Sequence, residues 1–329
     1  MSNINSPKLL WMDCDVGHDD AMMLLLALAN RELKVLGVST TYGNSSLAHT
    51  TNNTLSFLTA MGVTDVPVYV GSARPFVPHQ GKTERASEVH GESGLAGTNL
   101  LPVPAFSPSS IPAVEAMAKE FLKHPQGSIT LVVSGPMTNT ALLFGSFPET
   151  LSKIKEIIVM GGSIGIGNAT AAAEFNILCD PESAQSVFSL PILRGKIVLV
   201  PLDVTHTVLA TNDVLAQLDS SRSTFRKMIH DLLNYFKSTH GKIYAQHEGP
   251  PLHDPLTVFY MLNPNAFFEK TVNVEVELYG NSKGRTLCDM FERSNGPKNV
   301  RVTTKVDVDL FWQTMLGAVT VIDELASIN

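Results

Sequence analysis

The chain has 329 residues, of which 44% are hydrophobic and 17% are charged, and its formal net charge is −7. The hydrophobic fraction supplies a large core and excludes a broadly disordered chain. The negative charge, spread without a long basic run, argues against a protein that binds nucleic-acid phosphates, so we expect a small-molecule ligand.

Short apolar runs alternate with helical patterns from the start of the chain to Pro201. The apolar runs predict buried strands at Leu9–Met12, Val35–Thr40, Val66–Val70, Ile129–Val133, Ile157–Met160 and Ile197–Pro201. Helical patterns lie between most of these runs, at Asp20–Ala29, Leu47–Met61, Ile111–Lys123, Thr138–Phe144 and Pro181–Ser189. This order predicts an α/β fold with a mostly parallel central sheet and helices on both faces.

The rest of the chain is mainly helical by its pattern. We expect helices from Thr211, over Thr224–Tyr244, after Pro255 and over Leu310–Leu325, and strands at Val272–Leu278 and Val300–Thr304. Neither a repeat nor a linker divides the chain, so residues 1–329 are expected to form a single large domain. The segment 71–110 is longer than an idle loop should be, which predicts a functional loop.

Three features of the sequence indicate the cellular compartment. The longest apolar stretch, Ala21–Ala29, is far shorter than the ~20 residues that span a bilayer. The segment Met1–Lys8 lacks the pattern of a signal peptide. Cys14, Cys179 and Cys288 have no spacing that suggests a disulfide framework or a zinc site. We therefore expect a cytoplasmic protein.

Four carboxylates lie close together where the first predicted strand ends, at Asp13, Asp15, Asp19 and Asp20. Ligands of parallel α/β sheets bind outside this edge of the sheet. Carboxylates so close together repel unless a cation, hydrogen-bond donors or protonation compensates, and their hard oxygens suit Ca²⁺ or Mg²⁺. Helix capping is the alternative for Asp19 and Asp20, but it leaves Asp13 and Asp15 unexplained.

Other polar residues lie at the ends of predicted elements. His253 and Asp254 precede a proline that suits the first turn of a helix, and a capping Asp beside an exposed His is the alternative. Glu174 and Asn176 are two residues apart, which puts both on one face of a segment that we expect to be extended. Asn44 follows the second strand and either projects into the same crevice or forms a turn.

Taken together, these pieces resemble one family, the nucleoside hydrolases, which cleave the N-ribosyl bond of nucleosides. The resemblance covers Leu10 to about Leu262. Its motifs, in the family's order, are DCDVGHDDA (Asp13–Ala21), TTYGN (Thr40–Asn44), HGESGL (His90–Leu95), SGPMTNTA (Ser134–Ala141), VMGG (Val159–Gly162), GNAT (Gly167–Thr170), AEFN (Ala173–Asn176) and HDP (His253–Pro255). Val16 stands where the family usually has proline. The resemblance implies a Rossmann-like core and the nucleoside hydrolase fold.

The resemblance also implies a Ca²⁺ cofactor, held by the side chains of Asp15, Asp20 and Asp254 and by the backbone carbonyl of Ser134. The cation would activate and orient a water molecule, and Asp15 would accept its proton as general base. His253 would protonate the leaving base. The implied reaction converts a ribonucleoside to free base and ribose, in nucleoside salvage, through an oxocarbenium-like transition state.

Substrate contacts follow from the same resemblance. The ribose hydroxyls would be held by Asp19, Asn44, Asn168, Glu174 and Asn176. Met160 would line the sugar pocket, Phe175 would also contact the substrate, and His90 would lie near the base.

The segment 224–253 is expected to form, with 71–110, the loops and helices of the active site. It offers His240 and Tyr244 as base contacts, with Gln246 and His247 as alternatives. The alignment is ambiguous here, so the base preference (uridine, inosine and guanosine, or broad) stays open. We also expect a homo-oligomer, a dimer or a tetramer.

Three alternative functions fit parts of the sequence. In a phosphatase of the haloacid-dehalogenase type, Asp13 would be a nucleophile and Asp15 an acid/base, with Mg²⁺; this leaves HDP and AEFN unexplained. A catalytically inactive relative would bind only ribose and Ca²⁺. A dinucleotide-binding loop at Gly162–Gly167 lacks the GxGxxG order.

Overall fold

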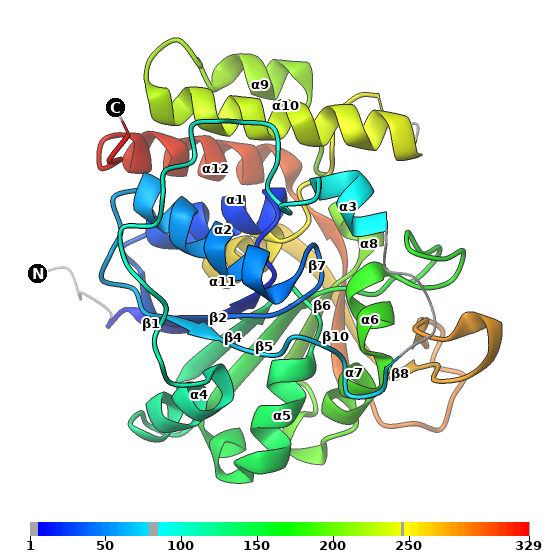
Figure 1. Ribbon diagram of the computed structural model, residues 1–329. Helices are drawn as coiled ribbons and strands as arrows, with labels where there is room; N and C mark the ends of the chain where they lie inside the picture. The colour runs from blue at the N-terminus through cyan, green and yellow to red at the C-terminus, as the bar shows by residue number, and fades with distance from the viewer. Residues whose placement is uncertain (1–5, 79–84, 245–246, 329) are drawn as a thin grey trace, which may run out of the picture.

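An eight-stranded sheet forms the centre of the computed structural model, which describes residues 6–78, 85–244 and 247–328 (Figure 1). The strand order is β3-β2-β1-β4-β5-β6-β10-β7, and all neighbours are parallel except β10 and β7. The strands are β1 (Lys8–Cys14), β2 (Leu33–Thr40), β3 (Val68–Val70), β4 (Ile129–Val133), β5 (Ile154–Met160), β6 (Ile197–Val200), β7 (Phe267–Val272) and β10 (Val300–Val306). A separate antiparallel pair is formed by β8 (Val274–Val276) and β9 (Thr286–Cys288).

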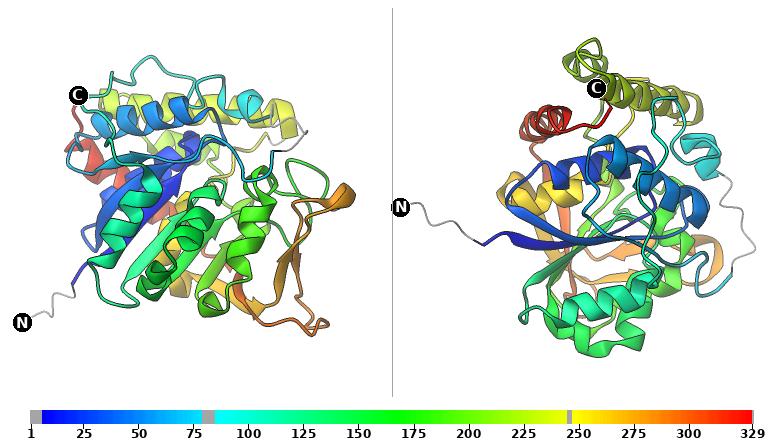
Figure 2. Two further views of the ribbon diagram at one scale, coloured as in Figure 1. Left: turned by 60° about the horizontal axis from the view of Figure 1, so that its bottom comes forward. Right: turned by 60° about the vertical axis from the view of Figure 1, so that its left-hand side comes forward.

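Helices cover both faces of the sheet, as the two turned views show (Figure 2). One face carries α1 (His18–Leu28), α2 (Leu47–Ala60), α11 (Pro255–Leu262) and α12 (Val308–Asp323), with α9 (Asn212–Gln217) and α10 (Thr224–Tyr244) outside them. The other face carries α4 (Ala113–Leu122), α5 (Thr138–Ser146) and α7 (Pro181–Phe188). Short helices are α3 (Arg85–His90), α6 (Phe175–Cys179) and α8 (Leu202–Thr205). None of the helices in the described ranges combines the length and the apolar character that a bilayer span requires.

The two hydrophobic layers explain why the strands are continuous apolar runs. Successive side chains of a strand point to opposite faces, and both faces of this sheet are covered. In β1, Leu10 and Met12 pack into the core under α1 and α11, whereas Trp11 packs into the core under α4 and α5. Trp11 stacks on Tyr69 of β3 there, at 5.4 Å between ring centroids.

The predicted fold class is confirmed, and the predicted helix over Thr224–Tyr244 has the bounds of α10. The single strand predicted over Val272–Leu278 is wrong. The chain pairs with β10 only as far as Val272, which lies opposite Val300, the first residue of β10. Beyond that point there is no partner in the main sheet, and Val274–Val276 pairs with β9 instead.

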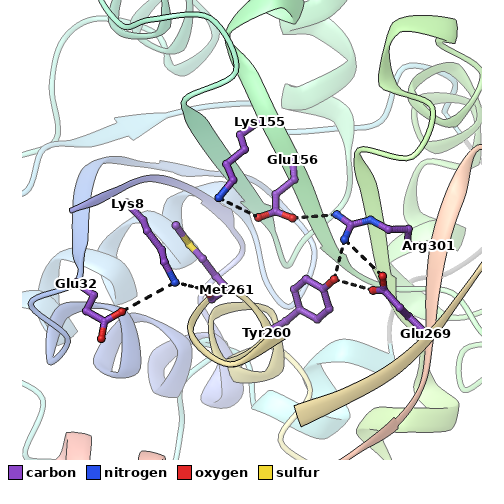
Figure 3. Close-up of polar contacts among 8 residues, drawn as sticks. All are labelled: Lys8, Glu32, Lys155, Glu156, Tyr260, Met261, Glu269 and Arg301. Carbon is purple, nitrogen blue, oxygen red and sulfur yellow. Dashed lines mark hydrogen bonds and ion pairs between the residues drawn. The ribbon is translucent and has the colours of Figure 1, made fainter. Parts of the chain in front are cut away.

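Polar contacts hold α11 to the sheet (Figure 3). Arg301 of β10 donates to Glu156 of β5 at 2.9 Å and to the Tyr260 hydroxyl of α11 at 2.8 Å. That hydroxyl donates to Glu269 of β7 at 2.6 Å, and Lys8 of β1 donates to a backbone carbonyl at the end of α11. The carboxyl end of α11 is thus tied directly to β10, β7 and β1, and through Arg301 to β5; its amino end begins directly after His253 and Asp254.

Candidate active site

Three buried carboxylates converge where α1 and α11 begin. Asp19 and Asp20 lie in the first turn of α1, and Asp254 precedes α11. One carboxylate oxygen of each lies within 4.8 Å of one oxygen of each of the others. Because α1 follows β1 and packs against α11, the fold brings together residues more than 200 positions apart in the sequence.

Asp15 lies directly after β1 and is completely buried. Its Oδ2 accepts a hydrogen bond from the backbone N–H of Asn44 at 2.7 Å. Its Oδ1 has no hydrogen-bond partner among the described residues. A Cβ at either Gly43 or Gly135 would collide with this carboxylate, so both glycines are needed for its close packing. A buried oxygen left unpaired in this way is suited to a cation or a water molecule.

Asn44 and Ser134 join the carboxylates to the neighbouring strand ends. The Asn44 amide donates to Asp20 Oδ2 at 3.0 Å and to the backbone carbonyl of Asp15 at 3.2 Å. The Ser134 hydroxyl donates to Asp20 Oδ1 at 2.7 Å. The Ser134 carbonyl, which the sequence predicts to be a metal ligand, accepts from the Asn176 amide at 2.6 Å.

Electrostatics favour a cation at this place. Burial raises the pKa of Asp15 well above its usual range, and the charge of Asp20 adds to the increase. Burial and the charges of Asp19 and Asp20 likewise raise the pKa of Asp254. The carboxylates therefore resist being ionised together when only protein surrounds them. A divalent cation among their oxygens would offset this repulsion, so the donor set fits a hard metal ion.

The segment around Glu174 is a helix start and not the extended strand that we expected. Glu174 precedes α6, and its carboxylate accepts hydrogen bonds from the backbone N–H groups of Asn176, Ile177 and Gly162 at 2.8–3.0 Å. Glu174 and Asn176 lie together because the Glu174 carboxylate caps α6 and accepts from the backbone N–H of Asn176, two residues later. Burial raises the pKa of Glu174 to about 7, against the effect of these hydrogen bonds.

A cavity of about 1020 Å³ lies beside the carboxylates. Its walls include most of the predicted site residues, namely Asp19, Asn44, His90, Ser134, Met160, Asn168, Glu174, Phe175, Asn176, His240, Tyr244, His253 and Asp254. Asp15 and Asp20 are buried behind this wall. Both segments predicted to form the site contribute, 71–110 through residues of α3 and 224–253 through α10.

The two alternative base contacts have different outcomes. His247 is exposed and does not line the cavity. Gln246 lies outside the described residues. His240 and Tyr244 are one helical turn apart on α10, with ring centroids 5.4 Å apart, and both line the cavity.

His253 has two neighbours at the end of α8, Thr205 and His206, that the sequence analysis missed. Its Nδ1 lies 2.7 Å from the hydroxyl of Thr205, and its ring meets the edge of His206 at 5.5 Å between centroids. Burial lowers the pKa of His253 well below its usual range, and His206 and His240 lower it further. A signal was present, because Thr205 and His206 follow a predicted strand at the edge where ligands bind.

A third missed residue, His18, contacts His90. Their Nδ1 atoms are 3.1 Å apart, and the His18 Nε2 is 2.8 Å from the carbonyl of Ala96. The His18 ring also stacks on Phe236 of α10 at 5.0 Å. Burial lowers the pKa of His18 to about 4. A Cβ at Gly17 would approach the His90 ring to 2.7 Å, so only glycine allows this approach.

Comparisons with known proteins identify the family of this chain. Residues 10–313 match the family described as inosine-uridine preferring nucleoside hydrolases. The pyrimidine-specific ribonucleoside hydrolase RihA of Escherichia coli O127:H6 is 40% identical over 91% of this chain and 93% of its own length. RihA of Shewanella woodyi is 38% identical over 92% of this chain and 96% of its own length.

Solved structures share the fold. The purine-preferring ribonucleoside hydrolase from Gardnerella vaginalis superimposes with a TM-score of 0.88 at 27% identity, covering 97% of this chain and all of that one. A plant nucleoside hydrolase gives 0.86 at 29% identity, with 95% and 99% covered. The fold and the site therefore define an enzyme of the N-ribosyl hydrolase class. The chain belongs to the inosine-uridine preferring nucleoside hydrolase family.

Proposed function

We propose that this enzyme hydrolyses ribonucleosides to free base and ribose, with a Ca²⁺ ion at the carboxylate cluster. The observation that carries the proposal is the unpaired buried oxygen of Asp15 beside the triplet of Asp19, Asp20 and Asp254, at the wall of the cavity of about 1020 Å³. The family membership supports the reaction class. It also argues against the phosphatase alternative. The nucleophile of that alternative, Asp13, is buried and accepts hydrogen bonds from Ser39 and Asn139.

The residues available to hold the cation are Asp15, Asp20 and Asp254, with the Ser134 carbonyl as a fourth oxygen. Asp19 belongs to the same triplet and also lines the cavity, so its carboxylate is shared between the cation and the ribose hydroxyls. When bound, Ca²⁺ lowers the pKa of a water molecule and orients it.

The chain's own groups divide the remaining work. Asp15 accepts a proton from the attacking water, whose oxygen forms the new bond to the anomeric carbon. The N-glycosidic bond breaks with its electron pair on the base, and His253 gives the base a proton. Positioning the two reactants contributes several kcal/mol of barrier reduction by general estimates, roughly 7–11 at the upper limit.

The substrate is held by the polar wall of the cavity. The ribose is bound by Asp19, Asn44, Asn168, Glu174 and Asn176, with Met160 and Phe175 against the sugar. His90, His240 and Tyr244 face the base. We propose a preference for pyrimidine ribonucleosides, because the RihA relatives named as pyrimidine-specific are 38–40% identical, against 27% for the purine-preferring structure.

The test is the release of free ribose from uridine, cytidine, inosine, guanosine and adenosine in a buffer without phosphate. We expect reducing sugar from the pyrimidine ribonucleosides at the highest kcat/KM, with no ribose 1-phosphate when phosphate is added. Turnover that requires phosphate, or activity on phosphate esters only, would contradict the proposal. Binding without turnover on all five substrates would identify the inactive relative instead.

Removal of the metal is expected to lower both activity and stability. After exhaustive chelation, kcat should fall to background and the thermal midpoint should fall as well, because the carboxylates are left to repel one another. At a cation concentration 100 times its Kd, the stabilisation is about 2.7 kcal/mol. Calorimetry of the chelated protein with added Ca²⁺ or Mg²⁺ measures the effect and identifies the metal. Full activity in the metal-free protein would contradict the assignment.

We further propose that the enzyme acts in nucleoside salvage in the cytoplasm. The three cysteines are free, as a reducing compartment would leave them. The homo-oligomeric state stays a prediction.

A further inference from the structure

Thr205 contacts His253 from the side away from the cavity. It ends α8, directly after β6, and is completely buried, whereas His253 lines the cavity. Its hydroxyl lies 2.7 Å from His253 Nδ1. The other acceptor near this hydroxyl, the Leu202 carbonyl, is 3.5 Å away and already accepts from the backbone N–H of His206 at 2.9 Å.

These distances indicate which of the two groups donates. A separation of 2.7 Å is typical of a hydroxyl donor and short for an N–H donor. If Nδ1 were the donor, the hydroxyl hydrogen would be left with the Leu202 carbonyl at the limit of hydrogen bonding. The hydroxyl therefore donates to Nδ1, which places the hydrogen of the neutral ring on Nε2. No described residue forms a hydrogen bond with Nε2, and this atom is not a fully buried atom without a partner. Because His253 lines the cavity, Nε2 is open to it.

We propose that Thr205 is a positioning residue that holds the His253 ring with its proton on Nε2, facing the leaving base. This inference rests on the proposed role of His253 as proton donor, and it adds a residue that does not touch the substrate.

The chemistry of the contact explains the choice of a hydroxyl. A carboxylate at Nδ1 accepts a hydrogen bond from the N–H of that atom and makes the imidazole a base, as in the Ser-His-Asp triad. A hydroxyl that donates to Nδ1 has the opposite effect. As the C–N bond breaks, the proton on Nε2 moves to the base, negative charge grows on the imidazole, and the Thr205 hydrogen bond stabilises that charge. Solvent returns the proton to Nε2 after the products leave.

The test compares three variants, each on uridine and on p-nitrophenyl riboside, whose leaving group departs without protonation. Thr205→Val keeps the shape and removes the hydroxyl, Thr205→Ser keeps the hydroxyl, and Thr207→Val removes an exposed hydroxyl that donates only to the Val204 carbonyl. We expect Thr205→Val to lower kcat on uridine about 10- to 100-fold and to change p-nitrophenyl riboside turnover less than about twofold. Thr205→Ser and Thr207→Val should retain activity on both.

A second measurement reports on the proton itself. Nitrogen-15 spectra of the histidine rings, assigned with His253→Asn, should show His253 protonated on Nε2 in the native protein and redistributed toward Nδ1 in Thr205→Val. Equal losses of Thr205→Val on both substrates, a serine variant as slow as the valine variant, or a native ring protonated on Nδ1 would each overturn the inference. His253→Ala, measured on the same two substrates, separates a failure of the proposed role of His253 from a failure of the proposed role of Thr205. If it shows no dependence on the leaving group, the proposed function of His253 fails; if it does and Thr205→Val does not, only the role of Thr205 fails.

Discussion

Replacement of Asp15 by asparagine is expected to lower kcat by about 10²–10⁴-fold on every riboside, whatever its leaving group. The amide can still accept the hydrogen bond from the Asn44 N–H, so the local fold is kept. It cannot take a proton from water, and it removes one negative charge from the proposed cation site. Steady-state kinetics on uridine and p-nitrophenyl riboside, with calorimetry of Ca²⁺ binding, measure both losses.

Asp13→Asn is the matched control, because Asp13 lies two residues before Asp15, within β1, and is equally buried. Its carboxylate accepts hydrogen bonds from Ser39, Asn139 and Thr140, and burial raises its pKa to about 6. Asp13→Asn should lower the free energy of unfolding, whereas kcat per folded molecule should stay unchanged. A large loss of kcat in Asp13→Asn with an active Asp15→Asn would point back to a nucleophile at position 13.

Replacement of His253 by alanine should separate leaving-group protonation from water activation. We expect a loss of about 10²–10⁴-fold on natural ribonucleosides and little loss on p-nitrophenyl riboside. The natural base needs a proton as the bond breaks, whereas p-nitrophenolate does not. The ratio of kcat on the two substrates is the measurement.

His247→Ala serves as its control, because His247 is exposed and outside the cavity lining. It should leave both rates unchanged. If His253→Ala loses the same factor on both substrates, the proton comes from elsewhere, and His240 on the cavity wall is the next residue to test.

The fold could be predicted because its signals are local. Buried parallel strands appear as continuous apolar runs, and α10 shows a helical period along its whole length. The site was also accessible from the sequence, since polar residues after parallel strands gather at one edge of the sheet. That rule places Asp15 and Asn44 together before any coordinates are known, whereas Ser134 was implied by the family resemblance.

The rest depends on contacts between distant segments. The pairing of His18 with His90 and that of Thr205 with His253 bring together residues 72 and 48 positions apart, and neither partner has a sequence pattern that points to the other. The extended segment predicted at Glu174 was wrong for a local reason. A spacing of two residues fits a strand face and a helix cap equally well, and only the N–H donors of Gly162, Asn176 and Ile177 decide between them.

The meeting of α1 and α11 has a consequence for how the enzyme is assembled. Asp15 follows β1, Asp19 and Asp20 lie in α1, and Asp254 directly precedes α11. Five of the eight strands of the sheet, β2 to β6, lie between Asp20 and Asp254 in the sequence. During synthesis, the nascent chain carries three of the four carboxylates long before the fourth emerges from the ribosome. The proposed cation site is therefore complete only after Asp254 has been synthesised. We expect two complementary fragments, one carrying α1 and the other α11, to regain the site only when α11 docks on α1.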